Sequence, residues 1–209
     1  MNCLIVTDIQ YDFCPGGALP VKEGDLIIPV INRLRRLFAT VVFIQDWHPK
    51  DHISFASNHN KKVGEVIQVK GTTQVLWPDH CVQNTQGARL REELDVKEDD
   101  FIVRKGTDPE VDSYSGFFDN QRVHKTTLDC YLQEKRAQHL YITGLATDYC
   151  VKFTVLDALD LGYQVTVVRD ATRGVDLNSG DVDIALKEMR KKGAQILDSD
   201  EVIKALQTK

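Results

Sequence analysis

Short runs of β-branched and aliphatic residues recur along this chain, and several are followed by stretches in which apolar residues repeat every three or four positions. Six runs are predicted as strands: residues 3–7, 40–45, 100–104, 139–143, 164–168 and 195–197. Runs such as 41–44 are apolar without alternation, which is typical of strands buried on both faces of a parallel sheet. The pattern therefore predicts an α/β fold, a three-layer α/β/α sandwich around a mostly parallel, Rossmann-like sheet.

Helices are predicted between the strands, over 124–136, from about 148 to 162, from 181 to 193, and from Asp25 onward, with Asp25 as the cap. In the helix after Asp25, five apolar residues repeat at helical spacing: Ile27, Ile28, Ile31, Leu34 and Phe38. Its three arginines, Arg33, Arg35 and Arg36, are expected to face solvent. In the helix from 181, Ile184, Ala185 and Met189 are expected to face the core.

Length and charge narrow the classes of protein that fit this sequence. At 209 residues, the chain is predicted to be one domain spanning 1–209. Lysine and arginine number 26 against 31 acidic residues, a net charge of -5 with both signs interspersed, so neither nucleic acid nor a membrane is an expected partner. The longest uncharged stretch, 137–147, is too short to span a bilayer, and the start lacks a basic leader, which predicts a cytoplasmic protein.

Chemically reactive residues follow four of the predicted strands. Asp8 ends the first, Asp46 the second and Lys105 the third, while the fourth leads within a few residues to Cys150. Because the carboxyl ends of parallel strands meet at one edge of a sheet, these side chains are expected to lie together. The five cysteines include no C-x-x-C pair, which argues against a disulfide framework and a structural zinc knuckle.

Cys150 is a candidate nucleophile. It falls in the first turn of a helix opened by Thr147 or Asp148, where the helix dipole favours a thiolate and lowers the thiol pKa. Lys105 would stabilise the thiolate, and Asp8 could take the thiol proton and return it to a leaving amine. The alternatives are a structural salt bridge between Asp8 and Lys105 and a cysteine that is merely a small buried residue.

Asp46 and His48 are two positions apart at a strand end, so their side chains project to the same side. His80 is the candidate for a third metal ligand. Two imidazoles and one carboxylate leave coordination positions open for water or substrate, as in reactive divalent-metal sites. Ser54 and His52 are further candidates for the metal shell, with Ser54 ranked slightly ahead.

Two segments, 49–99 and 105–122, interrupt the alternation of strands and helices and are rich in Gly, Asn, His, Ser and aromatic residues. Long excursions of this kind often build functional sites. Phe13, Trp77 and Tyr114 lie on loops at the same rim as the reactive residues and are expected to hold a flat ring. Trp47 and Tyr149 are interpreted as core residues.

Five sequence blocks resemble one known family: DIQYDF at 8–13, DWHP at 46–49, WPDHCV at 77–82, KG at 105–106 with YSGF at 114–117, and GLATDYCV at 144–151. In this order and across most of the chain, they resemble the nicotinamidases of the isochorismatase-like superfamily. The D-x-H and W-P-x-H-C blocks indicate the metal-dependent nicotinamidase branch. Tyr11 stands where the family commonly has Asn, and Leu145 stands where Val is frequent.

The resemblance implies a role for each candidate residue: a catalytic triad of Asp8, Lys105 and Cys150, a metal held by Asp46, His48 and His80, and a substrate slot lined by Phe13, Trp77 and Tyr114. It further implies a cis peptide bond between Leu145 and Ala146, which would direct the Ala146 N–H beside that of Cys150 as an oxyanion hole. The implied cofactor is one divalent ion, Zn, Fe or Mn, with zinc favoured.

The implied activity is hydrolysis of nicotinamide to nicotinate and ammonia through a cysteine thioester, in NAD salvage. One alternative is another cysteine amidohydrolase of this superfamily, acting on a carbamoyl or ureido compound. A second is a non-enzymatic module that binds metal or senses redox state through Cys150. The sequence leaves open the native metal, activity on pyrazinamide, and whether the chain forms a homo-oligomer.

Overall fold

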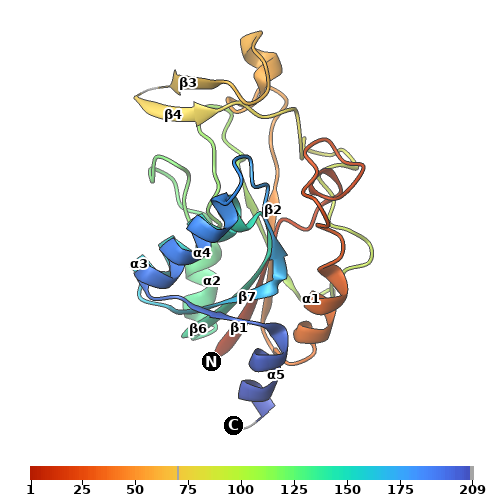
Figure 1. The fold of residues 1–209 in the computed structure, drawn as a ribbon, viewed down its shortest axis with the longest axis vertical. Helices are drawn as coiled ribbons and strands as arrows, with labels where there is room; N and C mark the ends of the chain where they lie inside the picture. The colour runs from red at the N-terminus through yellow and green to blue at the C-terminus, as the bar shows by residue number, and fades with distance from the viewer. Residues whose placement is uncertain (70, 208–209) are drawn as a thin grey trace.

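The computed structural model describes residues 1–69 and 71–207. Six strands within them form one parallel sheet in the order β5-β2-β1-β6-β7-β8 (Figure 1). The strands are β1 (Asn2–Thr7), β2 (Val41–Asp46), β5 (Phe101–Lys105), β6 (His139–Leu145), β7 (Gln164–Arg173) and β8 (Gln195–Leu197). The predicted α/β architecture with a mostly parallel central sheet is confirmed.

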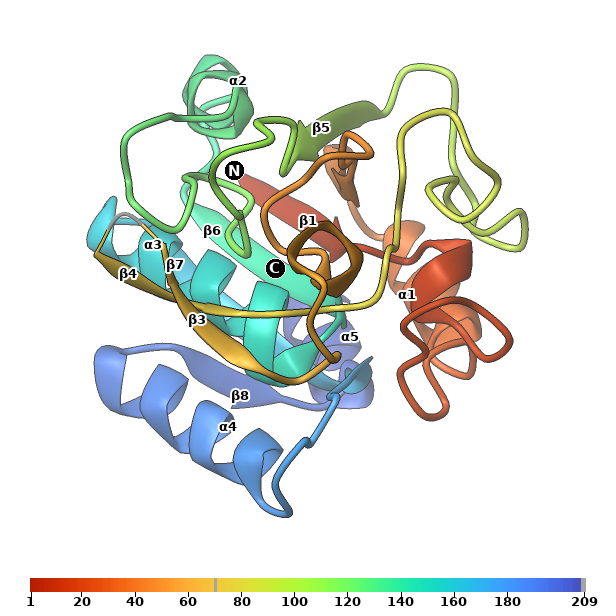
Figure 2. The ribbon, with the colours of Figure 1, turned by 90° about the horizontal axis from the view of Figure 1, so that it is seen from above.

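Helices cover both faces of this sheet (Figures 1 and 2). One face carries α1 (Ile28–Arg35) and α5 (Ser199–Gln207), and the other carries α2 (Leu128–Glu134), α3 (Lys152–Asp160) and α4 (Asp181–Lys192). Successive residues of β1 alternate between the two cores: Leu4 and Val6 pack on the α1 side, whereas Cys3 and Ile5 pack on the α2–α4 side. The central strands β1, β2 and β6 are thus buried on both faces, which explains the apolar runs within them.

Several helices differ from their predicted extents. Asp25 does not cap α1, because the helix begins three residues later with a proline in its first turn. The helix predicted over 124–136 forms only from Leu128 to Glu134. The turn that leads into α3 is a π-helix, η3 (Thr147–Val151), rather than an α-helical start. Apolar periodicity locates a helix but does not determine which backbone turn opens it.

Two predicted side-chain orientations are wrong. Arg35 was expected to face solvent, but it is buried, donates to the backbone carbonyl of Asp95 and pairs with Asp100 at 2.5 Å. The return segment before β5 covers this part of α1, so the arginine lies beneath it rather than in water. Ile184 was expected in the core and is 62% exposed, because α4 turns only a narrow face, with Ala185 and Met189, toward the sheet.

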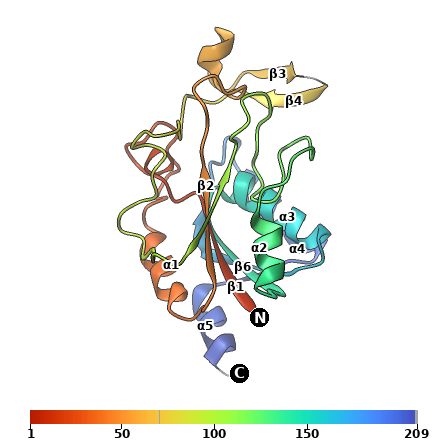
Figure 3. The same ribbon diagram turned by 180° about the vertical axis from the view of Figure 1, so that it is seen from behind.

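The long excursion after β2 lies above the carboxyl ends of the strands (Figures 1 and 3). It contains a 3-10 turn, η2 (Ala56–His59), and an antiparallel hairpin of β3 (Val66–Val69) and β4 (Thr72–Val75), neither of which was predicted. A single β-bridge joins two parts of the excursion, Phe55 and Trp77, and others join it to the residues after β1 and β2, at Gln10 to Leu90 and at His48 to Val82. Among the described residues, no helix combines the length and apolar character needed to cross a membrane.

Candidate active site

Four neighbouring strands bring the reactive residues to one edge of the sheet. Lys105 is the last residue of β5, Asp46 is the last of β2, and Asp8 directly follows β1. From β6 the chain enters η3, whose fourth residue is Cys150. The strands β5, β2, β1 and β6 are adjacent in that order, so the predicted gathering of these side chains occurs.

Lys105 is the centre of this cluster. Its side chain is fully buried, and Nζ lies 3.0 Å from Asp8 Oδ2 and 2.5 Å from Asp46 Oδ1. The same ammonium group donates to Cys150 Sγ at 3.4 Å and to the Ser113 carbonyl at 3.1 Å. The ion pair between Asp8 and Lys105 exists, but it does not stand alone, because the thiol lies within reach of the same cation.

Burial and mutual charge set the protonation of the three ionised groups. Burial opposes the charge of Lys105, but Asp46 and Asp8 outweigh it and raise the lysine pKa well above its usual value. Burial also opposes the charge of Asp46, yet Lys105 and His48 hold the pKa of that carboxyl far below its usual range. For Asp8, burial wins over the attraction of Lys105 and, with repulsion from Asp46, raises the pKa to about 7. Asp8 is therefore suited to exchanging protons near neutral pH.

Cys150 differs from the expectation of a lowered pKa. The residue is 6% exposed, and burial raises the pKa of its thiol well above the usual value although Lys105 opposes the shift. The thiol is consequently protonated, and a base must remove its proton before the sulfur can act as a nucleophile.

The segment that carries the thiol has an unusual backbone. The peptide bond between Leu145 and Ala146 is cis, as the resemblance implies. The Ala146 carbonyl accepts hydrogen bonds from Tyr149 N and Val151 N, each at 3.1 Å, which closes the π-helical turn. Ala146 and Cys150 both line the same pocket.

Asp46, His48 and His80 form a second buried cluster, in which one ligand atom from each residue lies within 4.8 Å of the others. His48 Nδ1 contacts the Gly106 carbonyl at 2.8 Å, and His80 Nδ1 contacts the Pro78 carbonyl at 2.7 Å. Since a carbonyl can only accept, both Nδ1 atoms carry a proton, which leaves Nε2 of each ring as the atom that can bind a metal. Nε2 of His48 and His80 lie 3.4 and 3.9 Å from Asp46 Oδ2. This donor set fits a divalent metal.

Further features support a metal in this cluster. Burial and the neighbouring His48 lower the pKa of His80 to about 4, which keeps the ring neutral, as a metal ligand must be. Gly106, at a φ of +63°, passes so close to the His48 ring that a Cβ there would collide with it. Asp46 connects the two clusters, because Oδ1 contacts Lys105 while Oδ2 faces the histidines.

His52 and Ser54, the further metal-shell candidates, are both fully buried beside this cluster. His52 Nδ1 and Ser54 Oγ are 2.7 Å apart, so these two side chains bond to each other. The His52 and His48 ring centroids are 4.0 Å apart, and His52 forms a separate group with His48 and Asp112. Burial and the charge of His48 lower the pKa of His52 to about 4.

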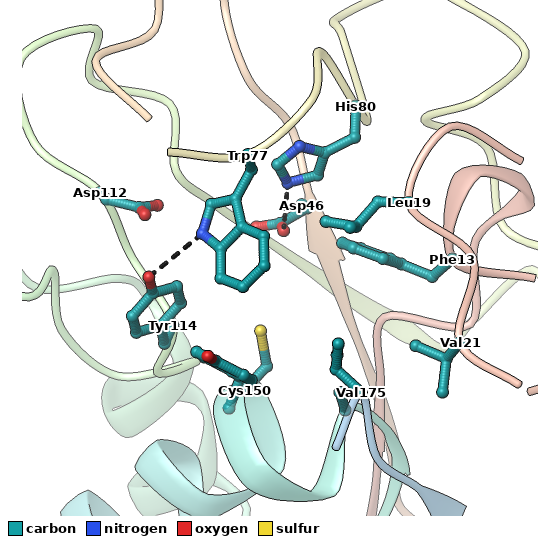
Figure 4. Close-up of a pocket in the computed structure, with 12 residues that line it drawn as sticks. Phe13, Leu19, Val21, Asp46, Trp77, His80, Asp112, Tyr114, Cys150 and Val175 are labelled. Carbon is teal, nitrogen blue, oxygen red and sulfur yellow. Dashed lines mark hydrogen bonds and ion pairs between the residues drawn. The ribbon is translucent and has the colours of Figure 1, made fainter. Parts of the chain in front are cut away.

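An aromatic pocket opens over both clusters (Figure 4). Phe13, Trp77 and Tyr114 line it, and Trp77 Nε1 donates to the Tyr114 hydroxyl at 3.2 Å. The sulfur of Cys150 and the side chains of Asp46 and His80 point into the same space. Sequence reasoning missed the remaining lining residues: Leu19, Val21, Asp112, Tyr149 and Val175. Most of them come from irregular loops, which carry no periodic signal that could identify them.

The parallel sheet, the buried thiol and the neighbouring donor cluster define an α/β enzyme with its site at the carboxyl edge of the strands. Residues 2–201 match the isochorismatase domain, and the chain belongs to this family. The resemblance to that superfamily is therefore confirmed.

The relatives and solved structures described next, to which this chain is similar, are nicotinamidases or pyrazinamidases. A nicotinamidase of Escherichia coli is 49% identical over 199 residues, which covers 93% of each chain. A nicotinamidase/pyrazinamidase structure from Acinetobacter baumanii has a TM-score of 0.93 at 42% identity, covering 96% of this chain and 97% of its own. A pyrazinamidase of Pyrococcus horikoshii in complex with zinc has a TM-score of 0.79 at 41% identity, covering 94% and 98%.

Proposed function

We propose that residues 1–209 form one hydrolase domain that converts nicotinamide to nicotinate and ammonia. The observation that carries the proposal is that the thiol of Cys150 and the metal cluster line a single aromatic pocket. A carboxamide attached to a pyridine ring presents a carbonyl carbon for a thiol and a ring nitrogen for a metal. The similarity to nicotinamidases supports this substrate over other amides. The nicotinate formed would enter pyridine nucleotide salvage.

Binding would use the aromatic walls and the metal cluster. Phe13, Trp77 and Tyr114 would stack on and enclose the pyridine ring and exclude water from it. A divalent ion held by Asp46, His48 and His80, with zinc favoured, would bind the ring nitrogen, orient the substrate and polarise it as a Lewis acid.

Acylation would begin with proton transfer from Cys150 Sγ to a carboxylate oxygen of Asp8. The sulfur attacks the carboxamide carbon, and the backbone N–H groups of Ala146 and Cys150 donate to the oxygen as it becomes negative. Lys105, 3.4 Å from the sulfur, stabilises the thiolate during this step. When the C–N bond breaks, Asp8 returns the proton to the leaving nitrogen, and ammonia departs from a thioester.

In deacylation Asp8 acts again as base and then as acid. Asp8, again a carboxylate, takes a proton from a water molecule, and the resulting hydroxide adds to the thioester carbonyl. The C–S bond then breaks, nicotinate forms, and the proton on Asp8 returns to the Cys150 sulfur. Because each half-reaction needs Asp8 in both protonation states, its pKa near neutrality suits the cycle.

The test is ammonia release from nicotinamide compared with benzamide, which has the same amide but no ring nitrogen. If the metal binds that nitrogen, benzamide should lose at least about a hundredfold in kcat/KM, or about 3 kcal/mol. His80→Ala should then impair nicotinamide hydrolysis strongly and benzamide hydrolysis little. Equal losses on both substrates would contradict the proposed role of the metal. Release from a ureido compound and not from nicotinamide would contradict the proposed substrate.

A further inference from the structure

Asp46 lies two residues beyond the last residue of β2 that pairs with β1. The pairing of β1 with β2 ends at Thr7 opposite Ile44. At Asp8 the backbone takes a positive φ of 51°, which turns the chain away from the sheet. The backbone of β1 therefore does not continue the ladder to Asp46, the residue that contacts both Lys105 and the metal histidines.

The side chain of Gln10 takes the place of that missing backbone. Its Oε1 accepts from Asp46 N at 2.8 Å, and its Nε2 donates to the Asp46 carbonyl at 2.8 Å. A primary carboxamide offers one acceptor and a pair of donor hydrogens, so it can satisfy both backbone groups of one residue, as a neighbouring strand would. The second donor hydrogen of Nε2 goes to the Ala88 carbonyl, also at 2.8 Å.

Gln10 is itself held firmly. The residue is fully buried, and its backbone N–H donates to the Asp8 carbonyl at 2.9 Å. It also forms a β-bridge with Leu90 on the excursion loop. The carboxamide is thus fixed relative to the turn that carries Asp8 on one side and to Asp46 on the other.

We infer that Gln10 is a positioning residue for Asp46, and through it for the metal site. Because Asp46 directs Oδ1 to Lys105 and Oδ2 to the histidines, a backbone fixed on both sides sets the direction of both contacts. Gln10 does not line the pocket, so it acts through Asp46 and not on the substrate. This inference deepens the proposed function. It rests on the proposed function only in taking Asp46, His48 and His80 as the metal site.

Gln45 provides a matched control, because its side chain also donates to the Ala88 carbonyl. Its Nε2 donates to the Ala88 carbonyl at 2.7 Å, and its Oε1 accepts from Arg104 Nε at 3.3 Å. Like Gln10 it is buried, but its side chain makes none of the hydrogen bonds described for the Asp46 backbone. Loss of the Gln45 amide therefore removes a buried hydrogen bond to the same loop without removing the support of Asp46.

The experiment compares Gln10→Met with Gln45→Met, each keeping side-chain length while removing the amide. Affinity for Zn²⁺ is measured by competition with a chromophoric chelator, and the visible absorption spectrum of the Co²⁺-loaded protein reports the ligand geometry. We expect Zn²⁺ binding to weaken by at least about tenfold in Gln10→Met, with an altered cobalt spectrum. Gln45→Met should stay within about threefold of the unsubstituted protein, with an unchanged spectrum.

Urea unfolding of both variants separates positioning from general destabilisation. Equal Zn²⁺ affinities in the two variants, or equal losses that follow their loss of stability, would overturn the inference. If Gln10→Met does not fold, Gln10→Glu replaces it, because it keeps the acceptor for Asp46 N and loses the donated bonds. The same weakening is expected, and unchanged affinity would overturn the inference.

These measurements need no substrate, so they separate this inference from the proposed function. An unsubstituted protein that binds Zn²⁺ but releases no ammonia from nicotinamide would refute the proposed function, and the contrast between the two glutamines would still support the role of Gln10. Failure of the unsubstituted protein to bind Zn²⁺ would overturn the inference directly.

Discussion

The ammonium group of Lys105 contacts two carboxylates, a backbone carbonyl and a thiol inside the protein. A buried cation of this kind is tolerated only because opposite charges surround it. Its proximity to both Asp8 and Asp46 means that the proton-transfer group and the metal ligand share one counter-ion. Substitution of either carboxylate would therefore change the electrostatic environment of the other, because both interact with Lys105.

Cys150→Ala should abolish hydrolysis and leave substrate binding intact, because it removes the sulfur while the pocket walls and metal ligands remain. Loss of a nucleophile from a cooperating group costs several orders of magnitude in kcat. Ammonia release gives the rate, and calorimetry gives nicotinamide affinity. Cys130→Ala, at an exposed thiol on α2, is the control and should retain full activity. A Cys150→Ala variant that keeps more than about a thousandth of kcat would rule out covalent catalysis.

Acid should inactivate the enzyme through Asp8. A carboxyl whose pKa is raised is protonated below that pKa and can no longer accept the thiol proton, so kcat/KM should fall about tenfold per unit on the acid side. A bound divalent cation nearby lowers the pKa, which places the midpoint between the usual 3.8 and about 7. Initial rates from pH 4 to 8 measure it. A flat profile above pH 4 would contradict Asp8 as the base.

The residues at strand ends could be predicted from the strand pattern, whereas only some of those on loops could be predicted, among them His80 and Trp77. Asp8, Asp46 and Lys105 follow buried apolar runs, so the rule that parallel strands share a carboxyl edge was enough to group them. Asp112 lines the same pocket, but it lies in an irregular segment where spacing does not determine side-chain direction. The raised pKa of Cys150 was also beyond prediction, because the degree of burial depends on the packed structure.

At the scale of the elements, α1 is fixed to the rest of the molecule by a polar contact inside its packed face. Arg35 and Asp100 have side chains only 4% and 8% exposed, and they join the helix to the residue just before β5. Asp100 also accepts from Lys97 N at 2.7 Å, so it organises the turn that precedes the strand. This ion pair therefore links a helix to an edge strand of the sheet.

Arg35→Met should lower the free energy of unfolding by about 3–5 kcal/mol, because it leaves the buried carboxylate of Asp100 without a counter-charge. Arg36→Met, at the exposed next position, should change it by less than about 0.5 kcal/mol. Urea denaturation followed by circular dichroism measures both. Similar small effects in the two variants would show that Asp100 finds another partner or water.

The type and order of the central strands were more predictable from the sequence than the short peripheral elements were. All six central strands were predicted to within a few residues, except that β7 continues to Arg173 past a register shift opposite β6. The β3–β4 hairpin was missed because its strands have only four residues each and bury little apolar surface. The short α5 was also missed, because its few buried residues form too brief a pattern to distinguish.

For the molecule as a whole, removal of the metal should weaken the fold without destroying it. The two apolar cores lie on the faces of the sheet, whereas the donor cluster lies at its edge, so chelation should leave cooperative unfolding intact. Metal present at a thousand times its Kd stabilises a protein by about 4 kcal/mol, so the melting temperature should fall by roughly 10 °C. Calorimetry with and without chelator tests this. Loss of the cooperative transition would identify the metal as a structural clip.

The order of strands in the sheet has a consequence for synthesis. β1 is flanked by β2 and by β6, and the bond between Thr143 Oγ1 and the Ile5 carbonyl joins residues 138 positions apart. On a ribosome, the first strand must therefore remain without one of its neighbours until most of the chain has emerged. Long-range pairing of this kind slows folding, and an exposed apolar strand edge invites association with other chains. The topology therefore leaves one edge of β1 unpaired for most of the time that the chain is being made.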